Sequence, residues 1–321
     1  MTEEILRRLL RETTLSGEAL SRELGVTRAA IWKQIERLRH AGFQIEAQPS
    51  GGYRLLACPD SLMAPLIERG LNTAWAGCAI TSLQSVDSTN RQARRMAADG
   101  APEGAVVLAD EQTQGRGRRG RGWLTPAGEG IALSILLRPK TPPARVALVS
   151  LSVALAAAEA CEAVAQVPAL LKWPNDVVLC GKKVAGILLE MDADEQQVHS
   201  LVAGIGFNVH QKTFPEEIAG TAISLDLASG KTIERAALVR AFLQVLERSE
   251  SLRAAGTLLP AYRARSATLG RSVLVFGANE RFDGVAEEIT PSGALLVRTQ
   301  DGELREVLAG DVSVRGLMGY V

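Results

Sequence analysis

The spacing of apolar residues changes twice along this 321-residue chain, and the changes divide it into three segments. In residues 1–58, apolar residues recur at helical spacing, and two short runs alternate between apolar and polar residues. Strand and helix signals then mix up to about residue 269, and only short alternating runs between turn residues follow. This succession predicts an α+β protein of several domains, with limits at 1–60, 66–268 and 269–321.

The central segment is expected to hold a mixed or antiparallel β-sheet with packed helices. Its strand candidates are residues 80–83, 105–109, 131–137, 170–173, 177–179, 183–190 and 199–208, and its helix candidates are residues 90–99, 143–164 and 233–252. Neighbouring strands pair as hairpins, as in VVLCGKKVAGILLE around Gly181, which does not fit a strict βαβ succession. The last segment has the strand spacing of a small β-barrel.

The composition of the chain limits how it could bind DNA, metal ions or a membrane. Hydrophobic residues make up 46% and charged residues 22%, and acids balance bases at 36 each, so any DNA binding needs a local basic patch. The four cysteines and three histidines lack metal-ligand spacing. The N-terminus is charged where a signal peptide is apolar, which predicts a cytoplasmic protein. The longest uncharged apolar run, residues 146–158, is shorter than the about 20 residues that cross a bilayer, so we expect a core helix and no membrane partner.

The N-terminal segment has the pattern of a winged helix-turn-helix. Ser16 and Thr27 are placed as N-caps of two helices that a turn at Gly25 separates. Two short alternating runs joined by Pro-Ser-Gly-Gly follow, as expected for a wing. In the second helix, Ile31, Ile35 and Leu38 share one face.

The second helix is basic, which favours DNA over the alternative of a protein-contact module. Residues 1–58 hold nine Arg or Lys against seven Glu. Arg28 and Lys33 are placed to reach phosphates or base edges, and small residues beside them permit close approach to a groove. Trp32, expected on the exposed face, would alter the DNA sequence that is recognised. The expected DNA contacts are Thr27, Arg28, Ala29, Lys33 and Arg37.

Residues 111–123, EQTQGRGRRGRGW, contain G-x-G-x-x-G and four arginines. A dinucleotide fingerprint needs a following helix and an acid about 20 residues further on, but Thr125-Pro126 follow and position 140 is Lys140. A solvated basic loop is one alternative. The other is an anion site, because glycines admit backbone N–H groups and arginines present forked donors. Such a loop is expected to be disordered alone and to order around an anion.

Three further stretches are candidate ligand contacts. LKWPNDVVL, residues 171–179, is either a simple turn or a cluster in which Asp176 meets Lys183 across a hairpin. DSTN, residues 87–90, places Ser88 or Thr89 as a helix cap, where a polar ligand also fits. AGIGFNV, residues 203–209, carries glycines that suit either a flat ring or tight strand packing.

In this order and at these separations, these motifs resemble those of biotin protein ligases. The N-terminal module resembles that of the bifunctional type, which is also the biotin operon repressor, and the likeness extends to the terminal GDVSVRG. The resemblance implies a central domain of the class II synthetase and biotin ligase type and a C-terminal SH3-like barrel. Lipoate and octanoyl transferases share the catalytic fold but lack this arginine loop and N-terminal module.

The resemblance implies a biotin–[acetyl-CoA-carboxylase] ligase. Biotin and ATP would form biotinyl-5′-AMP, with Mg²⁺ carried by ATP near Asp176 and no metal cage built from protein alone. A lysine of biotin carboxyl carrier protein would then accept biotin. The adenylate would also favour a homodimer that binds biotin operator DNA and represses biotin synthesis. The rivals are a ligand-sensing DNA-binding regulator without ligase activity and a ligase whose N-terminal domain represses nothing.

The resemblance also implies roles for individual residues. Ser88, Thr89, Gln112 and the Gly115–Arg116 backbone would hold the ureido ring of biotin, while Asn175 and Asp176 would position metal, phosphate or the incoming amine. Asn208 with Gly204 and Gly206 would line the adenosine side, and adenine contacts in residues 210–229 stay open. The implied catalytic residues are Lys183, Arg118, Arg116, Asp176 and Lys172. The implied ligand-binding residues are Ser88, Thr89, Asn90, Gln112, Gly115, Arg116, Gly117, Arg118, Arg121, Trp123, Asn175, Lys183, Gly186, Gly204, Gly206 and Asn208.

Overall fold

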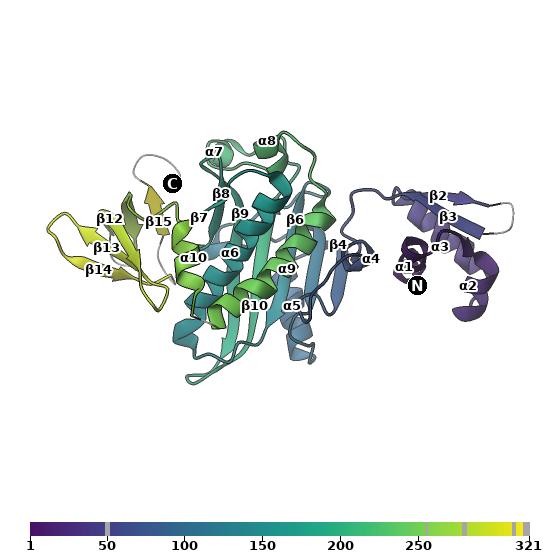
Figure 1. The fold of residues 1–321 in the computed structure, drawn as a ribbon, viewed down its shortest axis with the longest axis horizontal. Coiled ribbons are helices and arrows are strands. Elements are labelled where there is room, and N and C mark those ends of the chain that lie inside the picture. The colour runs from purple at the N-terminus through teal and green to yellow at the C-terminus, as the bar shows by residue number, and fades with distance from the viewer. Residues whose placement is uncertain (49–51, 255, 278–280, 310–312, 317–321) are drawn as a thin grey trace. The chain divides into compact units, whose positions relative to one another are not determined.

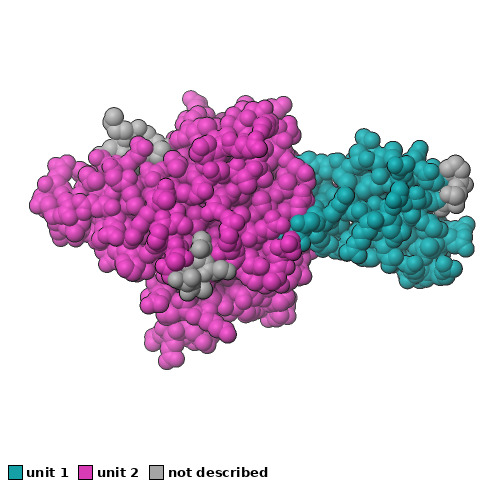
Figure 2. Space-filling model, in the orientation of Figure 1, with its two compact units in different colours: residues 1–71 teal, residues 72–321 magenta. Residues whose placement is uncertain are grey.

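The computed structural model describes residues 1–48, 52–254, 256–277, 281–309 and 313–316. The chain divides into two compact units, Met1–Leu71 and Asn72–Val321, which Figure 2 colours separately. Strands of the described residues form three sheets, one in the first unit and two in the second.

The first unit is a helix-turn-helix with a strand pair, as predicted (Figure 1). Both predicted caps form, because Ser16 Oγ accepts from Ala19 N at 3.3 Å and Thr27 Oγ1 accepts from Ala30 N at 3.2 Å. A short strand, Leu15–Ser16, precedes the helix that Ser16 caps and pairs with the expected hairpin as a third strand. The sequence did not predict this strand. Residues 49–51 of the expected turn lie outside the described residues. The elements are α1 (Thr2–Arg11), β1 (Leu15–Ser16), α2 (Gly17–Glu23), α3 (Arg28–His40), β2 (Gln44–Ala47), β3 (Gly52–Ala57) and α4 (Ala64–Glu68).

The large sheet of the second unit is mixed, as predicted. Its strand order is β4-β5-β6-β10-β9-β8-β7. Only the first pair is parallel, because α5 (Thr89–Ala98) connects β4 to β5, and every other pair is antiparallel. The strands are β4 (Ile80–Val86), β5 (Val106–Gln112), β6 (Gly130–Leu137), β7 (Leu170–Lys172), β8 (Asp176–Leu179), β9 (Lys182–Ala193) and β10 (Val198–Asn208).

The two faces of this sheet carry different helices. Side chains alternate along β10, so neighbours point to opposite faces. Phe207 meets Phe242 of α9 (Arg235–Ala254) with ring centroids 5.9 Å apart, which places α9 and its partner α6 (Val146–Ala165) on one face (Figure 1). Val202 packs with Ala93 of α5 on the other face. Gly204 and Gly206 belong to the α5 face, which is the face that holds the site.

Residues Pro143–Ala165 form a helix that is long and apolar enough to cross a membrane, judged by length and composition alone. It consists of one short turn, Pro143–Arg145, followed by α6. The helix agrees with the predicted range 143–164 and extends beyond the uncharged run 146–158, because it continues through two acids. Glu159 pairs with Arg248 and Glu162 with Arg265. Most of α6 is buried between α9 and the sheet, as expected for a core helix.

The C-terminal strands form an antiparallel sheet in the order β14-β13-β12-β11-β15. Trp173 Nε1 donates to Gly293 O at 3.1 Å, which joins this sheet to the end of β7. The strands are β11 (Ser272–Phe276), β12 (Arg281–Ile289), β13 (Leu295–Thr299), β14 (Leu304–Val307) and β15 (Ser313–Gly316). The sequence did not predict the short helices α7 (Glu216–Ala219), α8 (Leu225–Ser229) and α10 (Leu258–Ala264).

Candidate functional site

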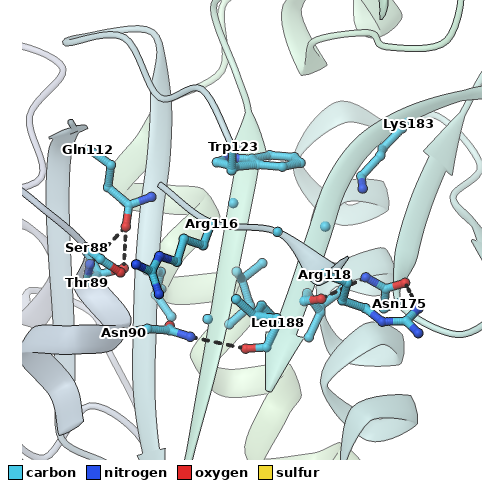
Figure 3. A pocket seen from close by; sticks show the side chains of 17 residues that line it. Ser88, Thr89, Asn90, Gln112, Arg116, Arg118, Trp123, Asn175, Lys183 and Leu188 are labelled. Carbon is cyan, nitrogen blue, oxygen red and sulfur yellow. Dashed lines mark hydrogen bonds between the residues drawn. The ribbon is translucent and has the colours of Figure 1, made fainter. Parts of the chain in front are cut away.

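A small pocket of about 50 Å³ lies on the α5 face of the large sheet. It is covered by residues 113–129, here called the arginine loop, which connect β5 to β6. Figure 3 shows Arg116 directed into the pocket from this loop, with Trp123 lying across the opposite side. Thirteen of the sixteen predicted ligand-binding residues line it: Ser88, Thr89, Asn90, Gln112, Arg116, Gly117, Arg118, Trp123, Asn175, Lys183, Gly186, Gly204 and Gly206.

The arginine loop folds back on itself through backbone hydrogen bonds. Gly117 N donates to Arg121 O at 2.7 Å, and Trp123 N donates to Gly115 O at 3.0 Å. A single 3₁₀ turn, Arg118–Gly120, forms its tip, and the next regular element is β6. Since no α-helix follows the glycines within these described residues, the dinucleotide interpretation fails. The expected ordering of the loop around an anion stays a prediction.

Gly115 lines neither this pocket nor the cleft beside it. A methyl group at Gly115 would lie 2.2 Å from Trp123 O and 3.0 Å from Gln112 Nε2. The two sides of the arginine loop therefore meet only because this residue has no side chain. This placement favours a structural contribution from Gly115 over the predicted contact of its backbone with a ligand.

The start of α5 forms the polar wall of the pocket. Gln112 Oε1 accepts from Thr89 N at 2.9 Å and from Thr89 Oγ1 at 3.1 Å, and the amide nitrogen of Gln112 points toward the pocket (Figure 3). Ser88 stands at the N-cap position, but its side chain accepts no capping bond. The predicted cap position is therefore confirmed at Ser88, but a glutamine of β5 accepts the hydrogen bond in place of its side chain. The hydrogen bond from Arg91, followed by that from Ser88 N, lowers the pKa of neighbouring Asp87.

A cationic group occupies the opposite end of the pocket. Lys183 Nζ lies 2.6 Å from Asp176 Oδ1, which confirms the predicted approach across the β8–β9 hairpin. Lys183 Nζ also lies 5.2 Å from the centroid of the Trp123 ring. Arg118 Nη1 donates to Asn175 Oδ1 at 3.0 Å, and the same guanidinium donates to Ala309 O. Two cations from different segments thus converge beside one amide and one carboxylate.

Glycines on β9 and β10 make room for these side chains. A methyl group at Gly206 would lie 2.1 Å from Trp123 Nε1, and one at Gly204 would lie 2.1 Å from Asn90 Oδ1. A methyl group at Gly186 would lie 2.9 Å from Lys183 Nζ. The glycines therefore serve close packing, and what packs against them is the wall of the pocket.

A larger cleft of about 690 Å³ adjoins the small pocket. The two cavities share Gly117, Arg118, Trp123, Asn175 and Lys183. The remaining predicted residues, Lys172, Asp176, Arg121 and Asn208, line only the cleft. Residues between 211 and 222, which the sequence left unassigned, form its far wall, and these include Gln211, Thr213, Phe214, Ile218, Thr221 and Ala222.

Comparison with known proteins agrees with this arrangement. Three family models match the chain: the biotin/lipoate A/B protein ligase family over residues 82–208, an HTH domain over residues 2–54 and the biotin protein ligase C-terminal domain over residues 268–315. The chain is 36% identical over 305 residues to the bifunctional ligase/repressor BirA of Bacillus spizizenii, with 94% of each chain covered. The chain belongs to the family of bifunctional biotin ligase/repressors.

Other relatives match the chain as well. The BirA of Escherichia coli is 31% identical over 305 residues, which cover 94% of this chain and 92% of that protein. The structure of the biotin protein ligase from Aquifex aeolicus in complex with biotin and ATP superposes with a TM-score of 0.66 at 31% identity. It covers 74% of this chain and 99% of its own length.

The sequence did not predict two polar residues that contact the wall of the pocket from behind. Ser134 Oγ, fully buried on β6, lies 2.6 Å from Asn90 Oδ1 and 2.8 Å from Thr89 Oγ1. Glu190 Oε2 accepts from Asn90 Nδ2 at 2.7 Å. Both connect the polar wall to the sheet. A serine inside the apolar strand Gly130–Leu137 was the available signal, because a buried hydroxyl requires a partner.

The acidic residues near the two cavities decide whether a divalent cation could bind there. Within the described ranges, no three His, Cys, Asp or Glu side chains are grouped closely enough to hold a metal ion. Asp176 lines the cleft and forms an ion pair with Lys183. The side-chain oxygens of Asn175 and Asp176 are ligands of the kind that Mg²⁺ takes, so these residues fit such an ion.

In the repressor unit, all five predicted DNA contacts are exposed on and beside α3. Thr27, Arg28, Ala29, Lys33 and Arg37 lie on the solvent side, while Ile31, Ile35 and Leu38 are buried. Trp32 is also exposed, as predicted, with 56% of its surface accessible. The helix therefore presents a basic face that contains one large aromatic ring.

Proposed function

We propose that this ligase/repressor activates biotin in the small pocket and transfers it to a lysine of a carrier protein. A carboxylate oxygen of biotin attacks the α-phosphorus of ATP, and the bond from that phosphorus to pyrophosphate breaks. The products are biotinyl-5′-AMP and pyrophosphate. The lysine amine of biotin carboxyl carrier protein then attacks the acyl carbon, AMP leaves, and the amine loses a proton as the amide forms.

The observation that carries this proposal is the position of Lys183 and Arg118 where the two cavities meet. A carboxylate that emerges from the small pocket would reach the phosphate of a nucleotide in the cleft at this point. Both side chains line both cavities. Fixed cations at this junction would stabilise the negative charge that develops on the phosphoryl oxygens.

The two cavities suit the two halves of the adenylate. The Gln112 amide nitrogen and the Ser88–Asn90 wall offer polar partners for the ureido ring of biotin, and Trp123 covers it. The cleft of about 690 Å³ has the size of a nucleotide site. Asn208 and the residues between 211 and 222 would surround adenosine. Asp176 would hold Lys183 in place, and Lys172, opposite Asp176 in the β7–β8 register, would add positive charge.

Mg²⁺ is proposed as a companion of ATP. When bound, it would neutralise charge on the phosphate oxygens near Asn175 and Asp176. The reaction is placed in the cytoplasm, which supplies ATP and keeps thiols reduced, and Cys78 and Cys180 are exposed thiols outside any disulfide. The domain limits 1–60, 66–268 and 269–321 remain predictions.

The same chain is proposed to repress transcription of biotin-synthesis genes. The exposed basic face of α3 and the β2–β3 hairpin support operator binding. One such unit binds DNA weakly, so a homodimer on a palindromic operator is expected, and formation of the adenylate would favour this dimer.

The ligase proposal is tested by incubating the protein with biotin, ATP, Mg²⁺ and a biotin carboxyl carrier domain. The mass of the carrier should rise by one biotinyl group, and pyrophosphate should appear. Lys183→Ala should lower pyrophosphate release by about 100-fold or more, since it would remove the cation proposed to lie at the transferring phosphate. Lys182→Ala is the matched control, because Lys182 lines neither cavity. Equal pyrophosphate release from both variants would refute the role of Lys183.

A further inference from the structure

Trp32 is a large aromatic residue that the fold of the first unit does not use. The buried residues of α3 are Ile31, Gln34, Ile35 and Leu38, which form the face toward the core. Trp32 lies off that face with 56% of its surface exposed. A single exposed apolar residue is ordinary in itself. The neighbours of Trp32 therefore decide whether the position has a function.

The neighbours of Trp32 toward the start of α3 are cationic or small, while Glu36, one turn after it, pairs with Arg39. Residues three and four apart are adjacent on a helix surface, so Arg28 and Ala29 lie one turn before Trp32, and Lys33 is next to it. Arg28, Ala29, Lys33 and Arg37 are all exposed. The indole ring thus stands inside a positively charged face. A partner that complements this face carries negative charge at its edges and an apolar group between them.

The major groove of DNA has this arrangement. An α-helix fits the groove, phosphates line both of its sides, and the C5-methyl group of thymine is the apolar feature at the base edges. The small side chain of Ala29 would allow the helix to approach closely enough for the indole ring to reach that methyl group. A free surface aromatic on a protein-binding helix would not require cations on both sides.

We propose that Trp32 reads DNA sequence by packing its indole ring against a thymine methyl group in the major groove. Arg28 and Lys33 would hold the flanking phosphates. Arg28 pairs with exposed Glu18 in the free protein, so DNA phosphate would replace a partner that is itself solvated. This inference rests on the proposed repressor function, because it names a residue that sets which operator is recognised.

The test begins by defining a site without assuming its sequence. The full-length protein, with biotin, ATP and Mg²⁺, is used to select from a double-stranded library with a randomised segment. Each thymine of the selected site is then replaced by uracil, which lacks only the methyl group, and affinity is measured by fluorescence anisotropy. At one thymine in each half-site, wild type should lose about fourfold or more in affinity, as expected for one buried methyl group.

Trp32→Ala should bind the selected site more weakly and should show no loss on uracil substitution at that thymine. It should retain the losses at other thymines. Trp32→Phe should keep part of the preference, because a phenyl ring preserves an apolar contact. Leu227→Ala, which truncates a comparably exposed (53%) apolar residue of α8, should behave as wild type. Thermal melting and biotin transfer by Trp32→Ala should match wild type, which shows that the fold is intact.

Two results would overturn the inference, and they are distinguishable. If wild type selects no sequence, the proposed repressor function fails together with it. If wild type selects a site but Trp32→Ala keeps the same thymine-to-uracil loss at every position, the repressor function stands and the role of Trp32 is refuted. Should Trp32→Ala prove unfolded, the Trp32→Phe variant decides: an unchanged uracil loss at all thymines refutes the contact.

Discussion

Gly186, Gly204 and Gly206 determine which side chains can reach the floor of the ligand site. They lie on the two central strands β9 and β10, and each leaves space that one pocket residue fills. Gly204 is the clearest case, because Asn90 occupies the volume that its side chain would need. Asn90 in turn contacts Ser134 and Glu190. The absence of one methyl group therefore orients a whole polar wall.

Gly204→Ala should weaken biotin binding by about tenfold or more, because the new methyl group would lie 2.1 Å from Asn90 Oδ1 and displace that wall. Overpacking of this kind should also lower the free energy of unfolding by about 1–3 kcal/mol. Isothermal titration and thermal melting measure the two effects. Gly220→Ala is the control, since open space surrounds Gly220 and its φ is −73°. Equal biotin affinity for both variants would contradict the packing argument.

Arg118→Gly should release the adenylate faster, because the variant removes a guanidinium that lines both cavities and bonds to Asn175. The released intermediate should label lysines of a bystander protein, which mass spectrometry detects. Arg119→Gly removes the same charge from the loop but no group from the small pocket, and should keep labelling confined to the carrier. Retention of the adenylate by Arg118→Gly at the wild-type level would disprove this role.

The sequence predicted the residues that line the two cavities better than the residues that hold them in place. Arginines, glycines and the Lys-Trp-Pro-Asn-Asp run are unusual enough to mark ligand contacts from sequence, and the structure gathers them around two adjoining cavities. Ser134 and Glu190 support that wall from distant strands. Their partners depend on strand order and register, which local sequence does not encode.

At the scale of elements, the arginine loop is held by the C-terminal sheet as well as by its own backbone. Arg118 donates to Ala309 O, and Arg119 Nη1 donates to Phe276 O at 3.5 Å. The long helices and strands followed their periodicity closely, but β1, α7 and α8 did not. Segments of two to five residues contain less than two periods, so only tertiary pairing defines them.

Glu247 ties α9 to the start of the second unit. Its carboxylate accepts from Ala74 N at 3.0 Å, from Trp75 N at 3.0 Å and from Ala76 N at 3.3 Å. Partial burial acts to raise the pKa of Glu247, but the three backbone donors together outweigh it and the pKa falls below its ordinary value of 4.5. Folding therefore favours the charged carboxylate, and this contribution is present above pH 4.5 and is lost as pH falls through the lower folded pKa.

Glu247→Gln should lower the free energy of unfolding by about 1–2 kcal/mol at pH 7, because an amide accepts these hydrogen bonds less strongly than a carboxylate. The difference from wild type should shrink as the pH is lowered below 4.5, where the wild-type residue becomes protonated. Chemical denaturation between pH 3.5 and pH 8 would follow it. Glu195→Gln, at an exposed position, should leave stability nearly unchanged. A pH-independent difference for Glu247→Gln would rule out the charged carboxylate as the cause.

At the scale of the whole molecule, one chain joins a DNA-binding unit to a ligase. The change of periodicity along the sequence was sufficient to predict this succession, because each segment has its own dominant period. The balanced total charge gives no sign of DNA binding, which we propose to depend on a local face of α3. Operator binding and biotin transfer should be coupled if the same adenylate promotes the dimer.

Biotin and ATP together should raise the affinity for the selected DNA site by about 5- to 150-fold, the usual range for coupling between two sites. Gel-shift titrations with and without both substrates measure the change, and analytical ultracentrifugation should show a parallel shift from monomer to dimer. Lys183→Ala, which is expected not to form the adenylate, should keep the lower affinity under both conditions while binding added biotinyl-5′-AMP analogue more weakly. Equal DNA affinity of the wild-type protein with and without the substrates would show that the two functions are not coupled.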